Sequence, residues 1–557
     1  MNALLLLLTW LAPIAALPAV YSRWGRWLPA IAALPALAAA LLVTADASVR
    51  IPWLLMGTQL GLDDTSRMFL LSGSLLWLIA GFYAASYMRD DAHAGRFNCF
   101  YLLAMSGNFG LIVGQDLMSF YVGFGLMGLA AYGLVVHDGT PSVRRAGRVY
   151  LVMTLIGELL LFAAFVSMYQ RTGSLVPTPE QLARGLGMTE VALLSSAFGI
   201  KAGLVGLHVW LPLAHPAAPV PASAVLSGVM IKSALVGWIR YLPLGVVALP
   251  DVGGVLIAAG VATAVLAIPL GVGQRDAKVV LAYSSIGKMG TMVAGIGFAA
   301  LEPALATPLI AAIAFYAAHH ALAKGALFLG VGVVKYRAGS WPLLTLAVPA
   351  LVLAGAPFTS GAVAKAQLKQ GLASAPPFWE SLFAIAAPVT LAGTVLLMAR
   401  FLYLNWRARD ASSTTLQGMD ISWIALVALS LALPLTRGEA AWEWSDAVIL
   451  LLVALGALWV ARKLPPWLTG CVGRIPPGDL VELSRLLPRG VFQRAGEPAL
   501  RGKAGITHRL ASLLTGADIE STASAGASAS AKPGLALAGL LWLCVLAALL
   551  LAMLLAG

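Results

Sequence analysis

Ten ionisable side chains lie within long apolar stretches of this sequence. In lipid, a charge near the middle of a helix costs about 2.5–3.5 kcal/mol, so each of these side chains needs a reason to be there. Most are lysines and histidines, which can gain and lose a proton near neutral pH when burial or a neighbouring charge adjusts them. A row of such groups bridged by water would carry protons. The ten are Glu158, Lys201, His208, Lys232, Lys288, His319, His320, Lys324, Lys365 and Lys369.

A structural role is the alternative for each of these side chains. Lysines near helix ends extend to the headgroups, and histidines are often hydrogen-bonded core residues. This alternative carries most weight for Lys369, and it is evenly balanced for His319 and Lys288. It carries least weight for the three lysines that have apolar sequence on both sides, which are Lys201, Lys232 and Lys324.

Proline-containing stretches interrupt the apolar sequence close to these lysines. "GIKAGLVGLHVWLPLAHPAAP" (199–219) contains Pro212 and Pro216, and "LAGAPFTSGAVAK" (353–365) contains Pro357. Proline removes a backbone donor and breaks a helix. Non-helical backbone at membrane depth is tolerated only inside protein or beside a water-filled cavity, and transporters place ion sites there. We therefore expect helix breaks at these prolines, and two interrupted helices in corresponding places indicate inverted repeats.

The composition indicates which elements must position these groups. The 557 residues are 60% hydrophobic and 11% charged, whereas soluble proteins have about 25% charged residues. Apolar runs near twenty residues long recur from end to end, long enough to cross a bilayer as helices. We predict an all-α polytopic membrane protein with about 16 transmembrane helices. The net charge of +12 comes from basic residues scattered through short loops, which indicates orientation and lipid contact rather than nucleic-acid binding.

The distribution of basic loops predicts the orientation. The loops that are richer in arginine and lysine are expected inside, which places both termini outside. Residues 464–533 contain short amphipathic patterns with basic faces, which could lie along the inner membrane surface, followed by a small-residue linker. The predicted spans lie near 3–20, 29–44, 67–87, 98–115, 117–136, 147–168, 188–210, 221–243, 250–273, 278–299, 305–334, 341–374, 382–405, 421–436, 446–461 and 534–556.

The sequence contains no pattern that would hold a cofactor or a metal. Cys99, Cys471 and Cys544 lie far apart and have no metal-ligand spacing. The sequence also has no CxxC motif and no nucleotide-binding glycine loop. We therefore predict no cofactor and no metal in this chain, and a conventional enzyme is the reading with least support.

Four motifs, in this order, resemble a known family: "HVWLPLAHPAAPVPASAVLSGVMIK", "VVLAYSSIGKMG", "HALAKGALFLGVG" and "GAPFTSGAVAK". Residues 70–405 are similar to the antiporter-like subunits shared by respiratory complex I, Mrp-type cation/proton antiporters and membrane-bound nickel–iron hydrogenases. Within this family, "RRAGRVYLVMT" and "LAHPAAP" look closest to the large antiporter-like subunit of formate hydrogenlyase and hydrogenase-four type complexes.

The resemblance implies two inverted five-helix repeats with helices seven and twelve broken, and a hydrated lysine/histidine axis at mid-membrane. Lys201 matches the helix-seven lysine, which pairs with an acid, and Lys232 matches the bridging lysine of helix eight. His320 and Lys324 match the helix-eleven histidine and lysine. Lys365 matches the helix-twelve residue that passes protons outward. The expected proton pathway also includes Glu158, His208 and Lys288.

The chain departs from the family pattern where the acidic partner of Lys201 is expected. Helix five of the family reads Trp-Glu-Leu-Met, whereas "FGLMGLAAY" has Phe124 and Gly125 at the first two positions. We hypothesise that Glu158, in "MTLIGELLLF", reaches into the space left by Gly125 and pairs with Lys201. The alternatives are a protonated Glu158 bonded to a backbone carbonyl, or a chain that has lost pumping and serves as a scaffold. Another family histidine is replaced by Tyr316.

Three functions remain open from the sequence. The main prediction is a proton-translocating subunit of a redox-driven complex, itself non-catalytic, in the bacterial inner membrane. It would contact other membrane subunits and, through them, a soluble redox module. The alternatives are an Mrp-like sodium/proton antiporter subunit and a non-conducting membrane anchor. The predicted division is 1–97 for N-terminal helices, 98–243 and 244–405 for the two antiporter-like repeats, 406–461 for C-terminal helices, 462–533 for the inner-surface segment and 534–557 for the final span.

Overall fold

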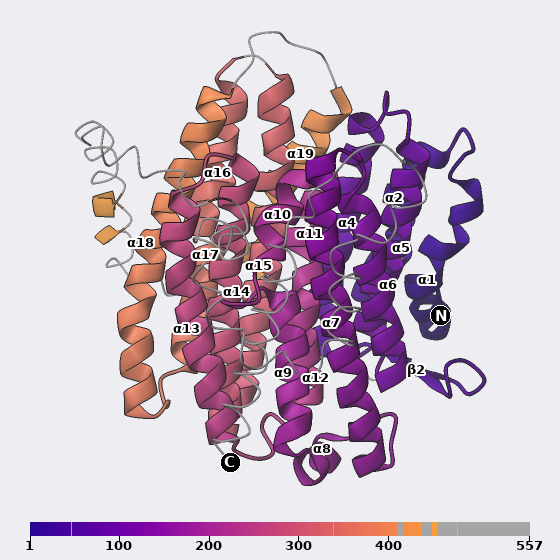
Figure 1. The fold of residues 1–557 in the computed structure, drawn as a ribbon, viewed down its shortest axis with the longest axis vertical. Coiled ribbons are helices and arrows are strands. Elements are labelled where there is room, and N and C mark those ends of the chain that lie inside the picture. Colours follow the sequence, from indigo (N-terminus) through magenta and orange to yellow (C-terminus); the bar gives the residue numbers. More distant parts are fainter. Residues whose placement is uncertain are drawn as a thin grey trace, which may run out of the picture.

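The structure is a computed structural model that describes residues 1–45, 47–337, 339–408, 417–436, 448–449, 451–453 and 476. The described residues form helices and one two-stranded hairpin (Figure 1). Among these residues, eleven helical stretches are long and apolar enough to cross a membrane. The predicted all-α polytopic membrane fold is confirmed, but the described residues do not reach the predicted number of about 16 spans. The predictions for 446–461, 462–533 and 534–557 fall almost wholly outside the described residues.

The N-terminal elements lie at one edge of the molecule, opposite α18 (Figure 1). The predicted span at 29–44 is divided into α2 and α3, each with a proline in its first turn, where the missing N–H is tolerated. The strands pair antiparallel, with Ser48 opposite Gly61. The elements are α1 (Asn2–Ala15), η1 (Leu17–Ala19), η2 (Gly25–Trp27), α2 (Leu28–Ile31), α3 (Leu34–Leu42), β1 (Ser48–Ile51), β2 (Thr58–Gly61) and α4 (Asp64–Tyr87).

Two consecutive sets of helices follow, each with three long helices and then a broken one. The first set is α5 (Ala94–Val113), α6 (Leu117–Val135), α7 (Pro141–Thr172), α8 (Pro179–Gly185), α9 (Met188–Ala202), α10 (Trp210–Ala217), α11 (Val220–Gly228), η3 (Met230–Lys232) and α12 (Ser233–Tyr241). The second is α13 (Pro250–Val272), α14 (Ala277–Leu301), α15 (Pro303–Tyr336), α16 (Trp341–Ala354), α17 (Ser360–Gly371) and α18 (Pro377–Arg407). The last described elements are α19 (Gln417–Ala432) and η4 (Leu433–Thr436).

The first two helices of each set pack through the same glycine contact. A Cβ at Gly107 of α5 would lie 2.6 Å from the carbonyl oxygen of Gly123 in α6. A Cβ at Gly260 of α13 would likewise lie 2.6 Å from the carbonyl oxygen of Gly290 in α14. Any side chain at these positions would separate the backbones, so glycine sets the close approach in both sets. The repeated contact supports the predicted two-repeat organisation.

The two broken helices also end in the same way. α9 ends before Gly203 and α16 before Gly355, and both glycines are left-handed, with φ of +74° and +82°. The N–H of each glycine donates to two carbonyl oxygens, four and three residues earlier. These distances are 3.0 and 3.2 Å for Gly203, and 3.0 and 3.1 Å for Gly355. The next N–H bonds to the carbonyl five residues back, at 3.0 and 3.1 Å. These shared caps stop both helices without leaving their last carbonyls unsatisfied.

Candidate functional site

Glu158 and Lys201 approach each other beside the glycines of α6. Both side chains are buried, Glu158 on α7 and Lys201 in the last turn of α9. The point where a Cβ of Gly128 would stand is 2.6 Å from Oε1 of Glu158 and 3.5 Å from Nζ of Lys201. Oε1 of Glu158 and Nζ of Lys201 are therefore no more than about 6 Å apart. No hydrogen bond to Oε1 exists among the described residues, so carboxylate and ammonium interact across a short gap.

Two neighbouring residues of α6 shape the space around this pair. A Cβ at Gly125 would lie 3.5 Å from Oε2 of Glu158, which is ordinary van der Waals distance, so the carboxylate occupies the space beside Gly125. The ring centroid of Phe124 lies 4.9 Å from Nζ of Lys201. An aromatic face at this distance stabilises an ammonium group by about 0.5–2 kcal/mol. Phe124 therefore holds the lysine head group near the carboxylate.

A small cavity adjoins the ammonium group of the pair. Its volume is about 10 Å³, and it is lined by Phe124, Thr154, Gly157, Ala197, Ile200, Lys201 and Trp210. A cavity needs roughly this volume to hold one water molecule, provided that polar partners are at hand. The lysine thus borders a space in which a single water molecule could receive or deliver a proton.

Glycines, rather than the predicted prolines, make the break that follows Lys201. Residues 203–209 are non-helical, and Gly203 and Gly206 have φ of +74° and +87°. Pro212 lies in the first turn of α10, where a missing N–H leaves no helical bond unmade. Pro216 lies inside α10, one residue before its end. The predicted helix breaks at Pro212 and Pro216 are therefore wrong in position, because the interruption comes before both prolines.

Two aromatic side chains connect this break to the neighbourhood of Glu158 and Lys201. Nε1 of Trp210, the first residue of α10, donates to the carbonyl oxygen of Ile200 at 2.8 Å. The ring of Tyr150 lies edge-to-face against Trp210 at 5.3 Å, and its hydroxyl donates to the carbonyl oxygen of Gly128 at 2.9 Å. A movement of α10 would therefore reach both the backbone next to Lys201 and the glycine beside the carboxylate.

Two fully buried lysines lie at the centre of the molecule. Nζ of Lys232 donates to the carbonyl oxygen of Ser227 at 2.5 Å, at the end of α11. Nζ of Lys324, on α15, donates to the carbonyl oxygen of Leu281 at 2.8 Å. The hydroxyls of Ser227 and Ser285 are 2.7 Å apart, so polar groups continue between α11 and α14. Both lysines face the protein interior rather than lipid, which is the arrangement expected of functional charges in a membrane.

The predicted histidines differ in their surroundings. His320 is 0% exposed, and neither of its ring nitrogens has a hydrogen-bond partner among the described residues. His319 is bonded through Nδ1 to the hydroxyl of Ser360, at 2.9 Å, and so links α15 to the start of α17. His208 lies in the first break with its ring edge-to-face with Tyr283, at 6.1 Å. Of the three, His320 is the one whose two ring nitrogens are both without a protein partner among the described residues, so a neutral ring could accept a hydrogen bond from water at one nitrogen and donate from the other.

Lys365 lies against the second broken helix. Pro357 is within the non-helical stretch between α16 and α17, where Phe358 has φ of +64°. Nζ of Lys365 donates to the carbonyl oxygen of Ala354, the last residue of α16, at 2.6 Å. A cation at this position is favoured by the negative end of the helix dipole. The ammonium group therefore lies at the break, beside a cavity that Lys288 also lines.

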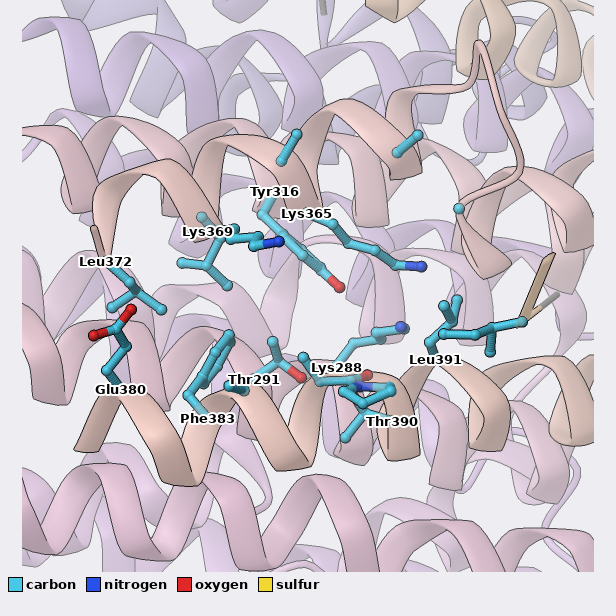
Figure 2. Close-up of a pocket in the computed structure, with 18 of the residues that line it drawn as sticks. Lys288, Thr291, Tyr316, Lys365, Lys369, Leu372, Glu380, Phe383, Thr390 and Leu391 are labelled. Carbon is cyan, nitrogen blue, oxygen red and sulfur yellow. The ribbon is translucent and has the colours of Figure 1, made fainter. Parts of the chain in front are cut away.

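A larger cavity of about 310 Å³ opens beside Lys365 (Figure 2). Lys288 and Lys365 direct their ammonium groups toward one side of it, next to the hydroxyl of Tyr316, and Lys369 points inward from the other side (Figure 2). Glu380 lies at the far end of the cavity (Figure 2). This cavity is large enough to hold several water molecules, and it has polar groups to bind them.

Sequence reasoning missed two residues that the structure brings into the site. Gly128 provides the space in which Glu158 and Lys201 meet, and only the packing of α6 against α7 and α9 reveals it. His215 on α10 is 0% exposed, and both its ring nitrogens lack a hydrogen-bond partner among the described residues. In the sequence, the only indication of a role for His215 was its position between two prolines of an apolar stretch. The described residues contain no group of three or more His, Cys, Asp or Glu placed to hold a metal ion.

Comparisons with known proteins bear on the same region. Residues 114–391 match the family described as NADH:quinone oxidoreductase/Mrp antiporter, TM. Hydrogenase-4 component B of Escherichia coli (strain K12) is 27% identical over 497 residues, which are 82% of this chain and 71% of the relative. A putative antiporter subunit mnhA2 of Staphylococcus saprophyticus is 29% identical over 392 residues, which are 64% of this chain and 49% of the relative.

Two solved structures share the fold. A chain of the Mrp complex from Dietzia sp. DQ12-45-1b superposes with a TM-score of 0.67 at 21% identity, covering 95% of this chain and 64% of that one. The second is a chain of the membrane-bound sulfane sulfur reductase (MBS), an archaeal respiratory membrane complex. It superposes with a TM-score of 0.65 at 17% identity, covering 85% of this chain and 99% of that one. The chain therefore spans about half of the mnhA2 relative and less than two thirds of the Mrp chain.

Proposed function

Residues 114–391 place this chain in the NADH:quinone oxidoreductase/Mrp antiporter transmembrane family, and we propose that it is a proton-translocating, antiporter-like subunit of a redox-driven membrane complex. The observation that carries the proposal is the approach of the Glu158 carboxylate to the Lys201 ammonium at the edge of a broken helix. A buried ion pair beside a break can be closed or opened by a small movement of the backbone.

The pair would act as the switch. While the carboxylate is close, it favours the charged form of Lys201 and keeps the proton there. When a conformational change separates the two groups, the lysine gives up its proton to the neighbouring small cavity. The proton then moves to Lys232, through His320 and Lys324, and to Lys365. Access must alternate between the two sides, because a permanently open path would short-circuit the membrane.

The hydrogen bonds of the relay lysines leave them able to bind water. Each of the ammonium groups of Lys232, Lys324 and Lys365 donates to a backbone carbonyl, at 2.5 to 2.8 Å. An ammonium group has three donors, so each lysine can also bond to water. The cavity of about 310 Å³ beside Lys365 gives the last lysine a polar space into which the proton can leave. His208 and Lys288 adjoin this path and complete the proposed set.

The energy would come from outside this chain. The superposed chains belong to an Mrp complex and to a respiratory membrane complex, and one relative is a component of hydrogenase-4. By analogy, other membrane subunits would contact this chain in a bacterial inner membrane, and a soluble redox module would act through them. The redox reaction would reach the Glu158–Lys201 pair as a conformational or electrostatic change.

The experiment is proton flux in proteoliposomes that contain the purified full-length chain and a trapped pH indicator. Glu158→Gln and Lys201→Met are expected to reduce flux at least tenfold. Glu190→Gln is the matched control, because Glu190 is also buried but is bonded to Ser167 and Arg171 at the far end of α9. Normal flux in both pair variants would contradict the proposed switch. A flux that requires sodium would instead favour the Mrp-like sodium/proton antiporter.

A further inference from the structure

The turn between α10, which follows the first break, and the span Val220–Tyr241 is buried. Ala218 is 2% exposed, and its carbonyl oxygen accepts a hydrogen bond from Nζ of Lys278 at 2.6 Å. The hydroxyl of Ser223 also bonds to this oxygen, at 3.2 Å. Lys278 lies in the first turn of α14, where the side chain of Asp276 fixes its backbone N–H at 2.8 Å. A lysine from another helix thus closes the turn, and it binds where the dipole of α10 is negative.

His215 lies directly behind this contact, three residues before Ala218. Its ring is 0% exposed and stacks on Phe328, with centroids 4.7 Å apart. Neither ring nitrogen has a hydrogen-bond partner among the described residues. Its charged neighbours are Lys324, Lys278 and Lys232, two of which belong to the proposed relay. A buried imidazole without a hydrogen-bond partner is costly and calls for an explanation. A neutral ring can accept a hydrogen bond from water at one nitrogen and donate at the other, which fits a relay between the surface and the central lysines.

Lys278 separates this histidine from the charged surface. The charged groups that act on Lys278 from outside are Asp276, Asp138 and Lys335, and all three are exposed. The side chain of Lys278 is half-buried, between these groups and the turn. The orientation predicted from the basic loops places the surface that carries these three groups on the inner side of the membrane. Lys278 is therefore a charged group that is close both to His215 and to the charged groups of this surface.

α10 is also attached at both of its ends. At its start, Trp210 bonds to the carbonyl oxygen of Ile200, next to Lys201. Just after its end, the carbonyl oxygen of Ala218 accepts a hydrogen bond from Nζ of Lys278. A helix of eight residues is short and stiff, so a displacement at one end is transmitted to the other. The closed turn is therefore linked mechanically to the Glu158–Lys201 pair.

We infer that Lys278 is a positioning residue that keeps the α10–α11 turn closed over His215, so that protons enter from this surface only when the Lys278–Ala218 contact opens. This inference rests on the proposed function. It assigns the inner gate of the path to a contact between α14 and α10, and α10 couples that gate to the ion pair.

Hydrogen–deuterium exchange of the purified full-length chain tests the closed turn without any flux measurement. Lys278→Met is expected to speed exchange of the backbone amides at 217–225 at least tenfold. Lys278→Arg, which keeps a cationic donor, is expected to restore exchange to within threefold of the original rate. Lys335→Met is the matched control and is expected to leave exchange unchanged, because Lys335 is an exposed lysine on the same surface. Lys278→Gln replaces the methionine variant if that variant does not fold. Its exchange rate at 217–225 is expected to lie between the rates of Lys278→Arg and Lys278→Met.

The inference is overturned if exchange in Lys278→Met equals that of the original chain, if Lys335→Met raises it as much, or if Lys278→Arg restores nothing. Proton leak into proteoliposomes is measured in parallel and is expected to rise in Lys278→Met. If the original chain carries no flux that depends on Glu158, the proposed function fails, whereas the exchange result still decides whether Lys278 closes the turn.

Discussion

Replacing Gly128 by alanine tests whether the space beside α6 belongs to the ion pair. The new methyl group would lie 2.6 Å from Oε1 of Glu158 and 3.5 Å from Nζ of Lys201. The first distance is too short for a non-bonded contact, and the carboxylate is the flexible partner, so it must rotate away. The methyl group then stands between the two charges.

The size of the effect follows from the distances. At an effective dielectric constant of about 20, unit charges at the upper limit of about 6 Å attract by about 2.8 kcal/mol, and charges moved to about 8 Å attract by about 2.1 kcal/mol. The difference of about 0.7 kcal/mol corresponds to roughly a threefold change in the population of the closed pair. The lost space for water adds to this, so Gly128→Ala is expected to lower proton flux about three- to tenfold.

Gly125→Ala is the matched control in the same proteoliposome assay. A Cβ at Gly125 would lie 3.5 Å from Oε2 of Glu158, which requires no movement. Both changes add one methyl group to α6 and raise its helix propensity by about 1 kcal/mol, so they differ only in their position relative to the pair. Flux that is unchanged in Gly128→Ala, or equally reduced in Gly125→Ala, would refute the reasoning.

Three further predictions concern the surroundings of the pair and the two breaks. Phe124→Leu removes the aromatic face beside the lysine and is expected to reduce flux two- to tenfold, whereas Phe124→Trp retains activity; equal flux in the two variants would contradict the cation–π contact. Gly203→Ala forces a side chain into a left-handed residue that also faces Leu211, and is expected to destabilise the chain by about 1–3 kcal/mol, measured as a fall in thermal unfolding temperature. Lys365→Met is expected to abolish proton release at the second break, whereas Lys369→Met, at an exposed lysine of the same helix, should change flux less than twofold; the opposite ranking would count against Lys365 as the last relay group.

The proximity of Glu158 and Lys201 could be predicted from the sequence because both are charges that apolar sequence isolates. A charge without a polar neighbour in its own helix must find a partner on another helix. The missing side chain at Gly125 correctly indicated the face of α6 that the Glu158 carboxylate approaches. Gly128 could not be recognised in the same way, because a glycine in an apolar helix gives no sign of which side chain fills the space that it leaves.

The position of the first break shows the opposite case. Pro212 and Pro216 indicated a break, but the effect of a proline depends on whether its residue must donate a helical bond. In the first turn of α10, Pro212 has no bond to lose. The chain unwinds instead at Gly203 and Gly206, where positive φ is cheap only for glycine. His215 was missed because its isolation comes from α14 and α15, which are distant in sequence.

The most direct measurement of the central claim is proton flux in the double variant Glu158→Gln/Gly125→Glu. This variant moves the carboxylate from α7 to α6, at a position next to the present site of the Glu158 carboxylate. If an acid next to that lysine is what switches the path, flux is expected to fall at least tenfold in Glu158→Gln and to recover to at least a third of the original rate in the double variant. A double variant that folds, positions its new carboxylate near Lys201 and still carries no more flux than Glu158→Gln would contradict the claim.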